Sequence, residues 1–508
     1  MIGKVESICL HGYECVFVSV EVDILPGPMN MQIVGLGDNA VKESRDRIRS
    51  AITHSGFVYP VQQLIVNLAP NDRQKEGATA ELAIAAAILV ASGQLPQEIF
   101  YDTLLLGSLS LDGTLQNPKG MMSCVIEARA IEHRRSVLVP VASLNEVECI
   151  PGIQIYPLSN LSNLRGFCDG TISLHQATKY QAQRSYQSTG FAQIKGQSKA
   201  KSGLAYAAVG KHHSLMMGAP GTGKTMLAKA FESLMPPLSL EESLQTTRLY
   251  SVSGLVQGSL IKNIPFRSPH HTTSEYAMVG GGSVPQPGEV SLSHNGVLFL
   301  DELMEFKSAT LQALREPLEE KKVTISRARG ISVFPADFIL IAAANPCRCG
   351  YFLSEKKSCD CTSLQVQTRY RKIVGPFLDR ISIEIETTEE SSMVLLNEGK
   401  EKSNDWWYSK IVEARKRMEY RNGNISNSRL SANEIFEFTS SVKSWKPLIE
   451  KYAVSLGLSH RGIINSLRLA MSIMDFKETN SMTEDILEQA FSFRVIGYIQ
   501  KTLSELAA

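Results

Sequence analysis

The stretch LMMGAPGTGKTMLAKAFESLM, residues 215–235, decides the fold of the middle of the chain. Its centre, GAPGTGKT at 218–225, fits the phosphate-binding pattern G-x-x-x-x-G-K-S/T between an apolar run and helix-forming residues. Glycines let the backbone curl so that successive N–H groups point at phosphate oxygens, and the next helix adds its positive end. The stretch therefore predicts a strand, a phosphate loop and a helix of an α/β domain that binds a nucleoside triphosphate.

The residues of this loop are all candidate ligands of a nucleotide. Lys224 can reach the β- and γ-phosphates, and the hydroxyl of Thr225 can hold Mg²⁺. An ordinary glycine-rich turn is the alternative, which the flanking strand and helix patterns disfavour. The remaining candidates, which surround the phosphates with backbone groups, are Gly218, Ala219, Pro220, Gly221, Thr222 and Gly223.

Two apolar runs downstream of the loop end in polar residues, as expected for strands of a parallel sheet that gather ligands at their carboxyl ends. GVLFLDE at 296–302 ends in Asp301, a candidate for holding Mg²⁺, and Glu302, a candidate for polarising the attacking water. FILIAAAN at 338–345 ends in Asn345, whose amide can orient that water. The alternative for Asn345 is a turn residue that ends its strand.

Two arginines further along the chain are catalytic candidates. Arg380 lies in GPFLDRI at 375–381, and Arg461 lies in LSHRGIINSLRLA at 458–470, near a predicted helix start. Arginines supplied to the γ-phosphate by a neighbouring subunit or a lid are frequent accelerators of phosphoryl transfer. Without the nucleotide motifs upstream, both residues would be interpreted as ordinary surface arginines.

Composition and charge narrow the class of protein. The 508 residues include 52 Lys and Arg against 51 Asp and Glu, a net charge of +1, so a local patch must make any contact with nucleic acid. The longest apolar run, 82–91, is too short to cross a bilayer, and the first residues lack the pattern of a secretory signal. Nine cysteines in such a chain suit a reducing compartment. The sequence therefore predicts a cytoplasmic protein without a membrane partner.

Changes of pattern divide the chain into four parts. Short strands alternate with helices in an α/β domain at 1–172, and a polar linker rich in Gln, Ser and Thr follows at 173–190. A second α/β domain with the phosphate loop spans 191–388, and helical patterns dominate 389–508. The elements predicted in the first domain are strands at 16–24, 62–70 and 136–140, helices at 40–54 and 80–91, and a hairpin at 104–115. The helices predicted in the last part are 404–421, 431–439, 446–456, 460–475 and 483–504.

In their order, these motifs resemble those of the AAA+ ATPases, and the finer resemblance is to the magnesium-chelatase-like family with its ComM (YifB) competence proteins. It rests on PFRSPHHTTSEYAMVGGG and PGEVSLSHNGVLFLDEL within 265–303, REPLEEKKVTISRA at 315–328, NPCRCG at 345–350 and GPFLDRI. The resemblance covers the whole chain. It implies an AAA+ core followed by a helical lid of the magnesium-chelatase type, with ATP and Mg²⁺ as cofactors.

The resemblance also implies an assembly. The family suggests a homo-hexameric ring with ATP between adjoining subunits. Arg380 would then enter the site of the neighbouring subunit, whereas Glu302 and Asn345 would act in their own subunit. Whether Arg461 acts in its own subunit or in the neighbouring one stays open.

ComM-like proteins are DNA helicases that drive branch migration while single strands integrate during natural transformation. The resemblance therefore implies an ATPase that moves single-stranded and branched DNA, with recombination proteins as candidate partners. A magnesium-chelatase subunit and an AAA+ remodelling chaperone are the alternatives. The front domain argues against the chelatase, which normally lacks it, and the complete set of nucleotide motifs argues against a passive scaffold.

KKVTISRARGISVFP at 321–335 has two alternating strands around a turn with two arginines, which predicts a hairpin with a cationic tip. In the family this place is the pre-sensor-1 hairpin, which points into the pore of related ring helicases. Lys322, Arg327 and Arg329 are therefore the candidate contacts to DNA phosphates. The alternative is a solvated hairpin without a ligand.

The glycine-rich loop at 279–288 resembles the helix-2 insert of the same class, and it suits a flexible loop that lines the pore or couples it to ATP. The neighbouring pair His270 and His271 could contact a metal or a phosphate. We favour a hydrogen-bonded pair in a turn, and we leave both histidines out of the candidate site.

Four cysteines, Cys347, Cys349, Cys359 and Cys361, form two C-x-C pairs within fifteen positions. Tetrahedral Zn²⁺ is bound by four thiolates, and a loop folded back on itself can supply them. The spacing departs from the usual C-x₂₋₄-C, and four free thiols are the alternative in a reducing compartment. We predict a structural zinc ion.

The front domain, 1–172, resembles the Lon-protease-like fold, also called ribosomal S5 domain 2-like. Thr79 stands where Lon-type proteases carry the nucleophilic serine, and Ser123 stands where they carry the lysine base, with Lys119 out of register. A hydroxyl nucleophile without its base is inert. The resemblance therefore implies a non-proteolytic domain that serves as a structural or DNA-handling platform.

Overall fold

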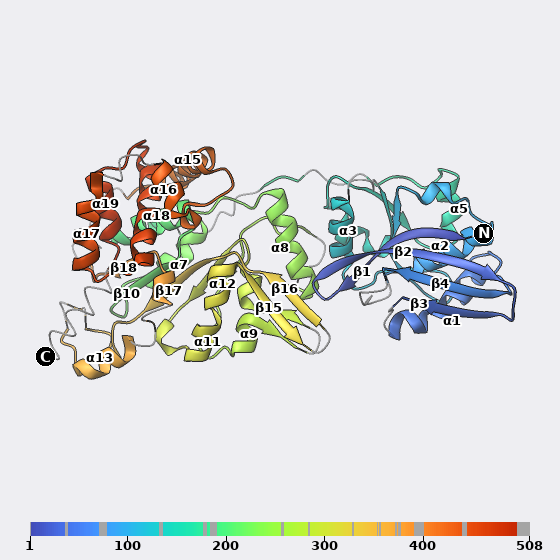
Figure 1. Ribbon diagram of the computed structural model, residues 1–508, viewed down its shortest axis with the longest axis horizontal. Helices are drawn as coiled ribbons and strands as arrows, with labels where there is room; N and C mark the ends of the chain where they lie inside the picture. Colours follow the sequence, from blue (N-terminus) through green and yellow to red (C-terminus); the bar gives the residue numbers. More distant parts are fainter. Residues whose placement is uncertain are drawn as a thin grey trace.

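The computed structural model is elongated, with the N-terminal strands at one end and the C-terminal helices at the other (Figure 1). The region of the phosphate loop lies between them. The structure describes residues 2–35, 39–70, 79–131, 136–175, 180–182, 190–255, 259–282, 285–327, 330–352, 354, 357–370, 373, 377–390, 401–438 and 444–494.

A seven-stranded sheet forms the N-terminal part, in the order β3-β4-β2-β1-β5-β8-β9. Strand β1 pairs antiparallel with β2, and β2 pairs antiparallel with β4, whereas the other neighbours in the sheet are parallel. The strands are β1 (Gly3–His11), β2 (Glu14–Leu25), β3 (Asn30–Val34), β4 (Gln63–Ala69), β5 (Thr103–Leu105), β8 (Ser136–Pro140) and β9 (Gln154–Leu158).

Helix α2 (Glu81–Ala91) packs against β1 and β2 and is buried on all sides, because nearly all its residues are aliphatic. The strands and helices predicted in this region are confirmed, and the hairpin predicted at 104–115 is present as the pair β6–β7. Strand β1 was not predicted. The other elements here are α1 (Asn39–His54), β6 (Ser108–Leu109), β7 (Leu115–Gln116), α3 (Met121–Ala130), α4 (Leu144–Val147) and α5 (Asn163–Cys168).

A second, five-stranded sheet carries the phosphate loop, in the order β11-β14-β17-β10-β18, and all its strands are parallel. Its central strands consist of buried apolar residues, as expected for a parallel sheet covered on both faces. The strands are β10 (Ser214–Gly218), β11 (Phe266–Arg267), β14 (Val297–Leu300), β17 (Ile339–Ala344) and β18 (Ile383–Thr387).

Short helices and two hairpins surround this sheet. The hairpin predicted at 321–335 is present as the antiparallel pair of β15 (Lys322–Arg327) and β16 (Gly330–Pro335), and β12 (Gly280–Gly281) pairs with β13 (Gln286–Pro287). The helices are α6 (Ser198–Gly210), α7 (Lys224–Glu232), α8 (Leu240–Val252), α9 (Glu275–Val279), α10 (Glu289–Leu292), α11 (Ser308–Ala313), α12 (Arg315–Glu320) and α13 (Ser363–Tyr370).

The C-terminal part is helical, as predicted, and α18 packs against α6, α15 and α19. Serine or threonine hydroxyls accept a backbone N–H at the starts of α15, α18 and α19, which fixes these helix boundaries. The helix predicted at 483–504 is shorter in the described part, because α19 ends at Phe491, and 495–508 lie outside the described residues. The helices are α15 (Asn404–Asn422), α16 (Ala432–Phe438), α17 (Lys446–Ser455), α18 (His460–Lys477) and α19 (Glu484–Phe491).

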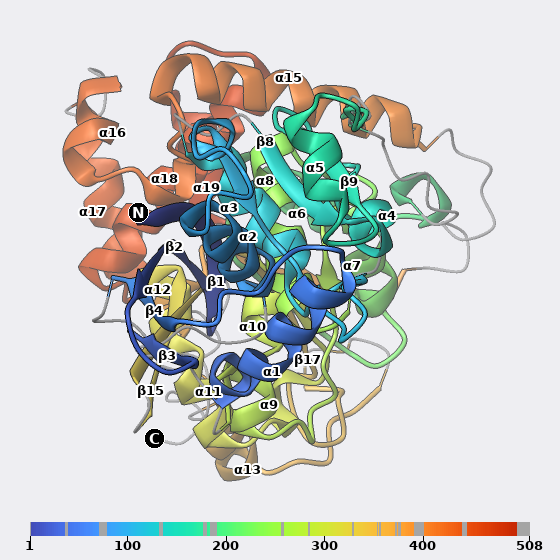
Figure 2. The ribbon, with the colours of Figure 1, turned by 90° about the vertical axis from the view of Figure 1, so that its right-hand side faces the viewer.

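The N-terminal sheet touches the second α/β region at the turn between β1 and β2, which lies beside β15 and β16 (Figures 1 and 2). The ring of Tyr13 lies 5.5 Å from that of Phe334 on β16, measured between centroids. Arg248 of α8 stacks over Tyr13 at 4.9 Å and forms an ion pair with Glu127 of α3 at 2.8 Å. Burial raises the pKa of Tyr13 to about 12, so its phenol stays neutral in this contact.

Part of the predicted linker is attached to both regions. His175 forms a β-bridge with Ile155, and the Tyr180 hydroxyl donates to the carbonyl oxygen of Leu238 at 2.7 Å. The rest of the predicted linker, 176–179 and 183–189, lies outside the described residues.

Candidate nucleotide-binding site

The phosphate loop curls between β10 and α7 around a cavity of about 430 Å³. Gly221 and Gly223 have φ angles of +81° and +84°, which only glycine adopts without strain. At Gly218 the reason for glycine is different, since an added Cβ would lie 2.2 Å from the carbonyl oxygen of Thr387 on β18. The cavity is lined by every loop residue from Pro220 to Met226 and by the polar ends of two neighbouring strands.

The side chain of Lys224 folds back onto its own loop. Its Nζ donates to the carbonyl oxygens of Gly218 and Ala219, each at 2.8 Å. Burial lowers the pKa of Lys224 to about 8, although the carboxylate of Asp301 opposes that shift. The amine is therefore a charged donor that is poorly solvated, and phosphate oxygens would compete well with the two carbonyls for it.

Thr225 and Asp301 are hydrogen-bonded to each other in the wall of the cavity. The threonine hydroxyl donates to Asp301 Oδ2 at 2.8 Å, and the backbone N–H of Glu302 donates to Asp301 Oδ1 at 2.9 Å. One hydroxyl and one carboxylate on adjacent elements are oxygen ligands of the kind that Mg²⁺ prefers. Asn345, which follows β17, lines the same cavity, as does Glu302. The structure thus brings together the loop, Asp301, Glu302 and Asn345, as the sequence predicts.

A second cavity of about 430 Å³ lies on the other side of the loop and was missed by sequence reasoning. Ile194, Gln197 and Met226 line it, together with Thr388 and Glu389 after β18. It adjoins the phosphate cavity and has room for the nucleoside part of a nucleotide. The residues before α6 carry no recognisable pattern, so only the fold reveals this place.

Glu302 has a partner that sequence reasoning left out. The Nδ1 atom of His271 lies 3.2 Å from Oε2 of Glu302. His270 forms a hydrogen bond with Thr272 within the turn, as the sequence predicts, but the prediction of a turn pair is incomplete for His271. Glu302 also has a φ of +51°, a strained value for a residue other than glycine, and such strain gathers at functional sites.

The structure separates Arg380 and Arg461 from the phosphate loop. Neither lines the cavities around the loop, and both instead bind the carboxylate of Glu319 on α12. The distance from Arg380 Nη2 to Glu319 Oε2 is 2.6 Å. Desolvation raises the pKa of Glu319, but hydrogen bonds from the two arginines outweigh it and hold the pKa below its usual range.

This arginine pocket, as we name the cavity lined by Arg380 and Arg461, has a volume of about 610 Å³. Lys321, Arg429 and Arg468 also line it. The lining of this cavity has five cationic side chains against two carboxylates, those of Glu319 and Glu320. Its net charge is therefore positive, which suits the binding of an anion.

Of the three candidate DNA contacts, Lys322 and Arg327 lie exposed on β15, and Arg329 lies outside the described residues. Alternate residues of β15, Val323 and Ile325, are buried under the hairpin. The two described cations therefore lie on a hairpin anchored by its apolar face.

The four clustered cysteines gather at one place. The sulfur of Cys347 lies 3.2 Å from that of Cys349 and 3.6 Å from that of Cys359, and the four sulfurs, with Cys361, lie within 4.8 Å of one another. The backbone N–H of Tyr351 lowers the pKa of Cys349 to about 6, whereas burial raises the pKa of Cys347 to about 12, so the negative charge of this pair rests on Cys349. Four sulfurs at this spacing fit the tetrahedral donor set of zinc.

Three family models of known proteins match successive parts of the chain. Residues 190–395 match the family model described as magnesium chelatase, subunit ChlI, residues 20–143 match that of subunit ChlI of Mg-chelatase, and residues 401–494 match that of the C-terminal part of subunit ChlI. The chain belongs to the magnesium-chelatase-like family of AAA+ ATPases. Membership in this family implies an ATPase that uses ATP and Mg²⁺.

Several relatives match along nearly the whole chain, and two of them illustrate the similarity. The uncharacterized protein YifB of Salmonella typhimurium is 36% identical over 97% of this chain and 96% of its own. The competence protein ComM of Haemophilus influenzae is 35% identical over 97% of this chain and 98% of its own. The magnesium-chelatase 67 kDa subunit of Chlorobaculum parvum is 27% identical over only 25% of this chain and 18% of its own. The chain is therefore a ComM/YifB-like member.

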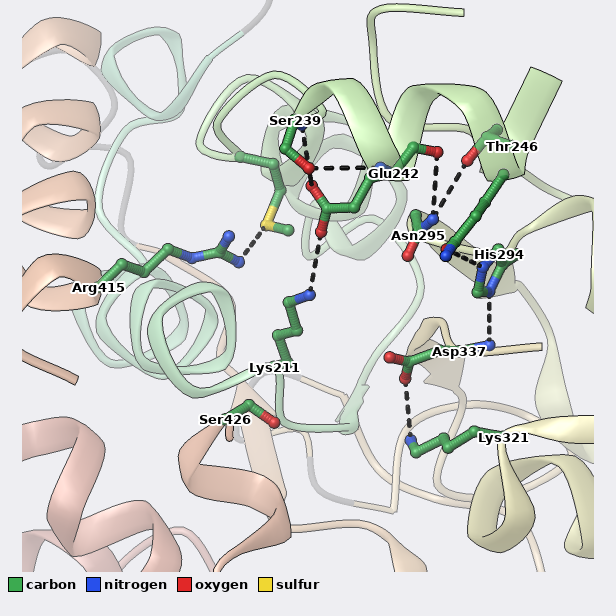
Figure 3. Close-up of polar contacts among 12 residues, drawn as sticks. Lys211, Ser239, Glu242, Thr246, His294, Asn295, Lys321, Asp337, Arg415 and Ser426 are labelled. Atoms are coloured by element: carbon green, nitrogen blue, oxygen red, sulfur yellow. Dashed lines mark hydrogen bonds and ion pairs between the residues drawn. The ribbon is translucent and has the colours of Figure 1, made fainter. Parts of the chain in front are cut away.

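At the amino ends of the strands of the nucleotide-binding sheet, opposite the phosphate loop, polar residues form a network of hydrogen bonds and ion pairs (Figure 3). Glu242 of α8 lies 3.6 Å from Lys211, and Asp337 lies 3.5 Å from Lys321 and donates its backbone N–H to Nδ1 of His294 at 3.0 Å. Desolvation lowers the pKa of His294 to about 4, so its ring is neutral and can accept that bond. The cavity beside this network, which Lys211, Glu242 and Asp337 help to line, has a volume of about 30 Å³ and room only for water, so we interpret the network as a structural brace.

The front region lacks an accessible hydroxyl nucleophile at the two positions that the Lon-type pattern marks. Thr79 and Ser123 are buried, and neither hydroxyl has a hydrogen-bond partner among the described residues. Lys119 is exposed at the surface.

In the described part of the chain, no helix is both long and apolar enough to span a membrane.

Proposed function

We propose that this protein is an ATP-driven DNA motor of the ComM type, a homo-hexameric ring that promotes branch migration while DNA strands integrate in natural transformation or homologous recombination. One observation carries the proposal. Arg380 and Arg461 line a pocket of their own and not the cavity of the phosphate loop, and this supports an assembly in which a second copy brings them to the nucleotide. The similarity to ComM over nearly the full length supports the choice of substrate.

The residues of the nucleotide cavity have complementary roles in this proposal. Lys224 binds the β- and γ-phosphates, and Thr225 with Asp301 holds Mg²⁺, which neutralises phosphate charge when bound. Glu302 accepts a proton from the attacking water, and Asn345 orients that water beside the γ-phosphate. No covalent intermediate is needed, because such sites work by positioning and charge neutralisation.

The arginine pocket supplies the second half of the site. Because Glu319 binds both Arg380 and Arg461, the two guanidinium groups lie side by side and face the same space. We therefore assign both arginines to the nucleotide of the neighbouring subunit. Arginines placed against the γ-phosphate stabilise the charge that develops during its transfer.

DNA would pass through the centre of the ring, against the β15–β16 hairpin. Lys322, Arg327 and Arg329 are the proposed phosphate contacts, and repetition of the hairpin in six copies would give a strongly positive pore in a protein of nearly zero net charge. The parts of the motor would be a Lon-like, non-proteolytic platform at 1–172, a linker at 173–190, the ATPase core at 191–388 and a helical lid at 389–508.

A structural zinc ion held by Cys347, Cys349, Cys359 and Cys361 completes the proposal. The same loop carries Gly350, whose added Cβ would lie 2.6 Å from Cδ of Pro220 in the phosphate loop. A metal that stiffens the cysteine loop would therefore support the phosphate loop and Asn345, which stands two residues before Cys347. The zinc has no direct role in hydrolysis.

A branched-DNA assay tests the function. Purified protein with ATP and Mg²⁺ is expected to resolve a mobile four-way junction into duplex products, and Lys224→Ala and Glu302→Gln are expected to be inactive. A parallel assay of Mg²⁺ insertion into a porphyrin tests the chelatase alternative. A protein that leaves the junction untouched, or that metallates the porphyrin, would contradict the proposal.

A further inference from the structure

We propose that Arg494 is a positioning residue for ATP hydrolysis, which holds Arg380 and Arg461 at a fixed separation so that both can reach one γ-phosphate. The inference rests on the proposed function and adds to it a residue outside the nucleotide motifs. It starts from the hydrogen bonds of one buried guanidinium group, which joins the two segments that carry these arginines.

Arg494 lies in the interior, where the last described helix ends beside the nucleotide-binding sheet. It follows the end of α19 by three residues, and its side chain is only 4% exposed. The backbone N–H of Glu384 on β18 donates to the carbonyl oxygen of Phe493 at 2.8 Å, which fixes the chain at this point. The carboxylate of Glu384, also buried, lies 3.4 Å from Nη1 of Arg494 and compensates its charge. Arg494 does not line the arginine pocket, so its effect on the pocket passes through other residues.

Every nitrogen of this guanidinium group has an acceptor on one of the two arginine segments. Nη1 donates to the carbonyl oxygen of Ile381, the residue after Arg380, at 2.7 Å. Nη2 donates to the carbonyl oxygen of Gly462, the residue after Arg461, at 3.2 Å. Nε donates to Oγ of Ser466, one turn further along α18, at 3.2 Å. One planar group therefore ties the two segments together, one residue away from each arginine.

The tips of the two pocket arginines are held in a different way from their backbones. Glu319 binds both guanidinium groups, but its side chain is 35% exposed, and that of Arg461 is 45% exposed. An exposed ion pair contributes little, and a phosphate, which carries more negative charge than a carboxylate, competes with it. When a γ-phosphate takes the place of Glu319, the separation of the two arginines depends on the backbone link through Arg494.

A lysine cannot replace Arg494 in this link. The three acceptors on the two segments are bound by three separate nitrogens. The single nitrogen of a lysine would keep a positive charge opposite Glu384 but could not join both segments in the same geometry. A displacement of about 1 Å in a group that acts on the reacting atoms can slow a reaction about 100-fold. Arg494→Lys is therefore expected to slow hydrolysis without removing a buried charge.

Steady-state ATPase rates of the full chain test the inference. Arg494→Lys is expected to lower kcat by about tenfold or more with the KM for ATP unchanged, because the phosphate loop that binds ATP belongs to another copy. Arg415→Lys is the matched control and should keep the wild-type kcat. Arg415 of α15 also lies in the helical part and donates to a carbonyl oxygen, that of Ala208, at 2.8 and 2.6 Å. An equal loss of kcat in both variants would reduce Arg494 to a structural residue.

A second pair of variants decides the question if Arg494→Lys does not fold. Ser466→Ala removes only the acceptor of Nε, and it is expected to lower kcat by about threefold. Ser472→Ala is its control, because Ser472 is a buried serine of the same helix that contacts Nε2 of His212, at 2.8 Å, instead. Equal rates in these two variants would overturn the inference.

Mixed assemblies separate positioning from a general loss of structure. Arg494→Lys mixed with Glu302→Gln should regain about a quarter of the wild-type rate, because some interfaces combine an intact glutamate with an intact arginine pair. Arg494→Lys mixed with Arg380→Ala should regain nothing, since every subunit then has a defective pair. Recovery in that second mixture, or none in the first, would contradict the role of Arg494.

The mixture of Arg380→Ala with Glu302→Gln shows whether the proposed function or the inference has failed. If this mixture regains no activity, the arginines do not act between subunits, and both the proposed function and the inference are wrong. If it regains activity while Arg494→Lys mixed with Glu302→Gln does not, the inference alone is wrong.

Discussion

Thr225 donates its hydroxyl hydrogen to Oδ2 of Asp301 over 2.8 Å, across 76 positions of sequence. The bond joins the start of α7 to the end of β14, and it presents two oxygen ligands on one side of the phosphate cavity. If these oxygens hold Mg²⁺, Asp301→Asn should lower kcat for ATP by about 100-fold and raise the Mg²⁺ concentration for half-maximal rate. Phosphate release over a Mg²⁺ titration measures both. Asp112→Asn, a surface aspartate in the β6–β7 turn, is the control, and an equal loss there would contradict the assignment.

Nucleotide affinity should depend on pH through Lys224. The pKa of this amine is about 8 in the free protein, so the amine is charged below that pH and loses its charge above it. Phosphate binds the charged form, and the affinity for a non-hydrolysable ATP analogue should therefore fall as pH rises through 8. Fluorescence titrations between pH 7 and 9.5 measure this. Lys224→Arg keeps its charge throughout and should lose the slope; a slope that persists would assign the dependence to another group.

Mixing inactive subunits tests where the arginines act. Arg380→Ala and Glu302→Gln should each be inactive, but an equal mixture should regain about a quarter of the wild-type ATPase rate, because some interfaces combine an intact glutamate with an intact arginine. A mixture of Arg380→Ala and Arg461→Ala should regain none if both arginines come from the same neighbour. Recovery in that second mixture would instead place Arg461 in the subunit that holds the nucleotide.

The cations of the hairpin should govern the salt dependence of DNA binding. Arg327→Glu combined with Arg329→Glu should weaken binding and flatten the plot of log affinity against log salt, by about one unit of slope for each lost phosphate contact. Fluorescence anisotropy with a labelled oligonucleotide measures it at several salt concentrations. Lys451→Glu, an exposed lysine of α17, is the matched control. An unchanged slope would move the DNA site elsewhere on the protein.

Metal analysis tests the cysteine site. Protein purified under reducing, metal-replete conditions should contain about one zinc per chain, as a Cys₄ site requires. Cys347→Ser should lose the metal and lower the melting temperature, whereas Cys168→Ser, a free cysteine of α5, should change neither. Substoichiometric zinc in the wild type would favour the four free thiols.

Much of the fold could be predicted from the sequence because it depends on short-range patterns. The phosphate loop, the apolar strands that end in Asp301 and Asn345, and α2 each carry a local signal of turn chemistry or hydrophobic periodicity. Strand β1 was missed because the alternation of apolar and polar residues in its first half gives way to a continuous buried run, Ser7–Cys9, and its antiparallel pairing with β2 defines it.

The residues themselves determined which groups can do chemistry here: a loop that only glycine-rich backbone can form, a lysine, a hydroxyl, two carboxylates and four thiols. Tertiary structure alone decided which of them meet. It joined Arg461 to Glu319 across 142 positions, turned Arg380 and Arg461 away from their own phosphate loop, and placed His271 against Glu302. The physical reason is that a local pattern specifies backbone conformation, whereas such meetings depend on how helices and strands pack around the shared core.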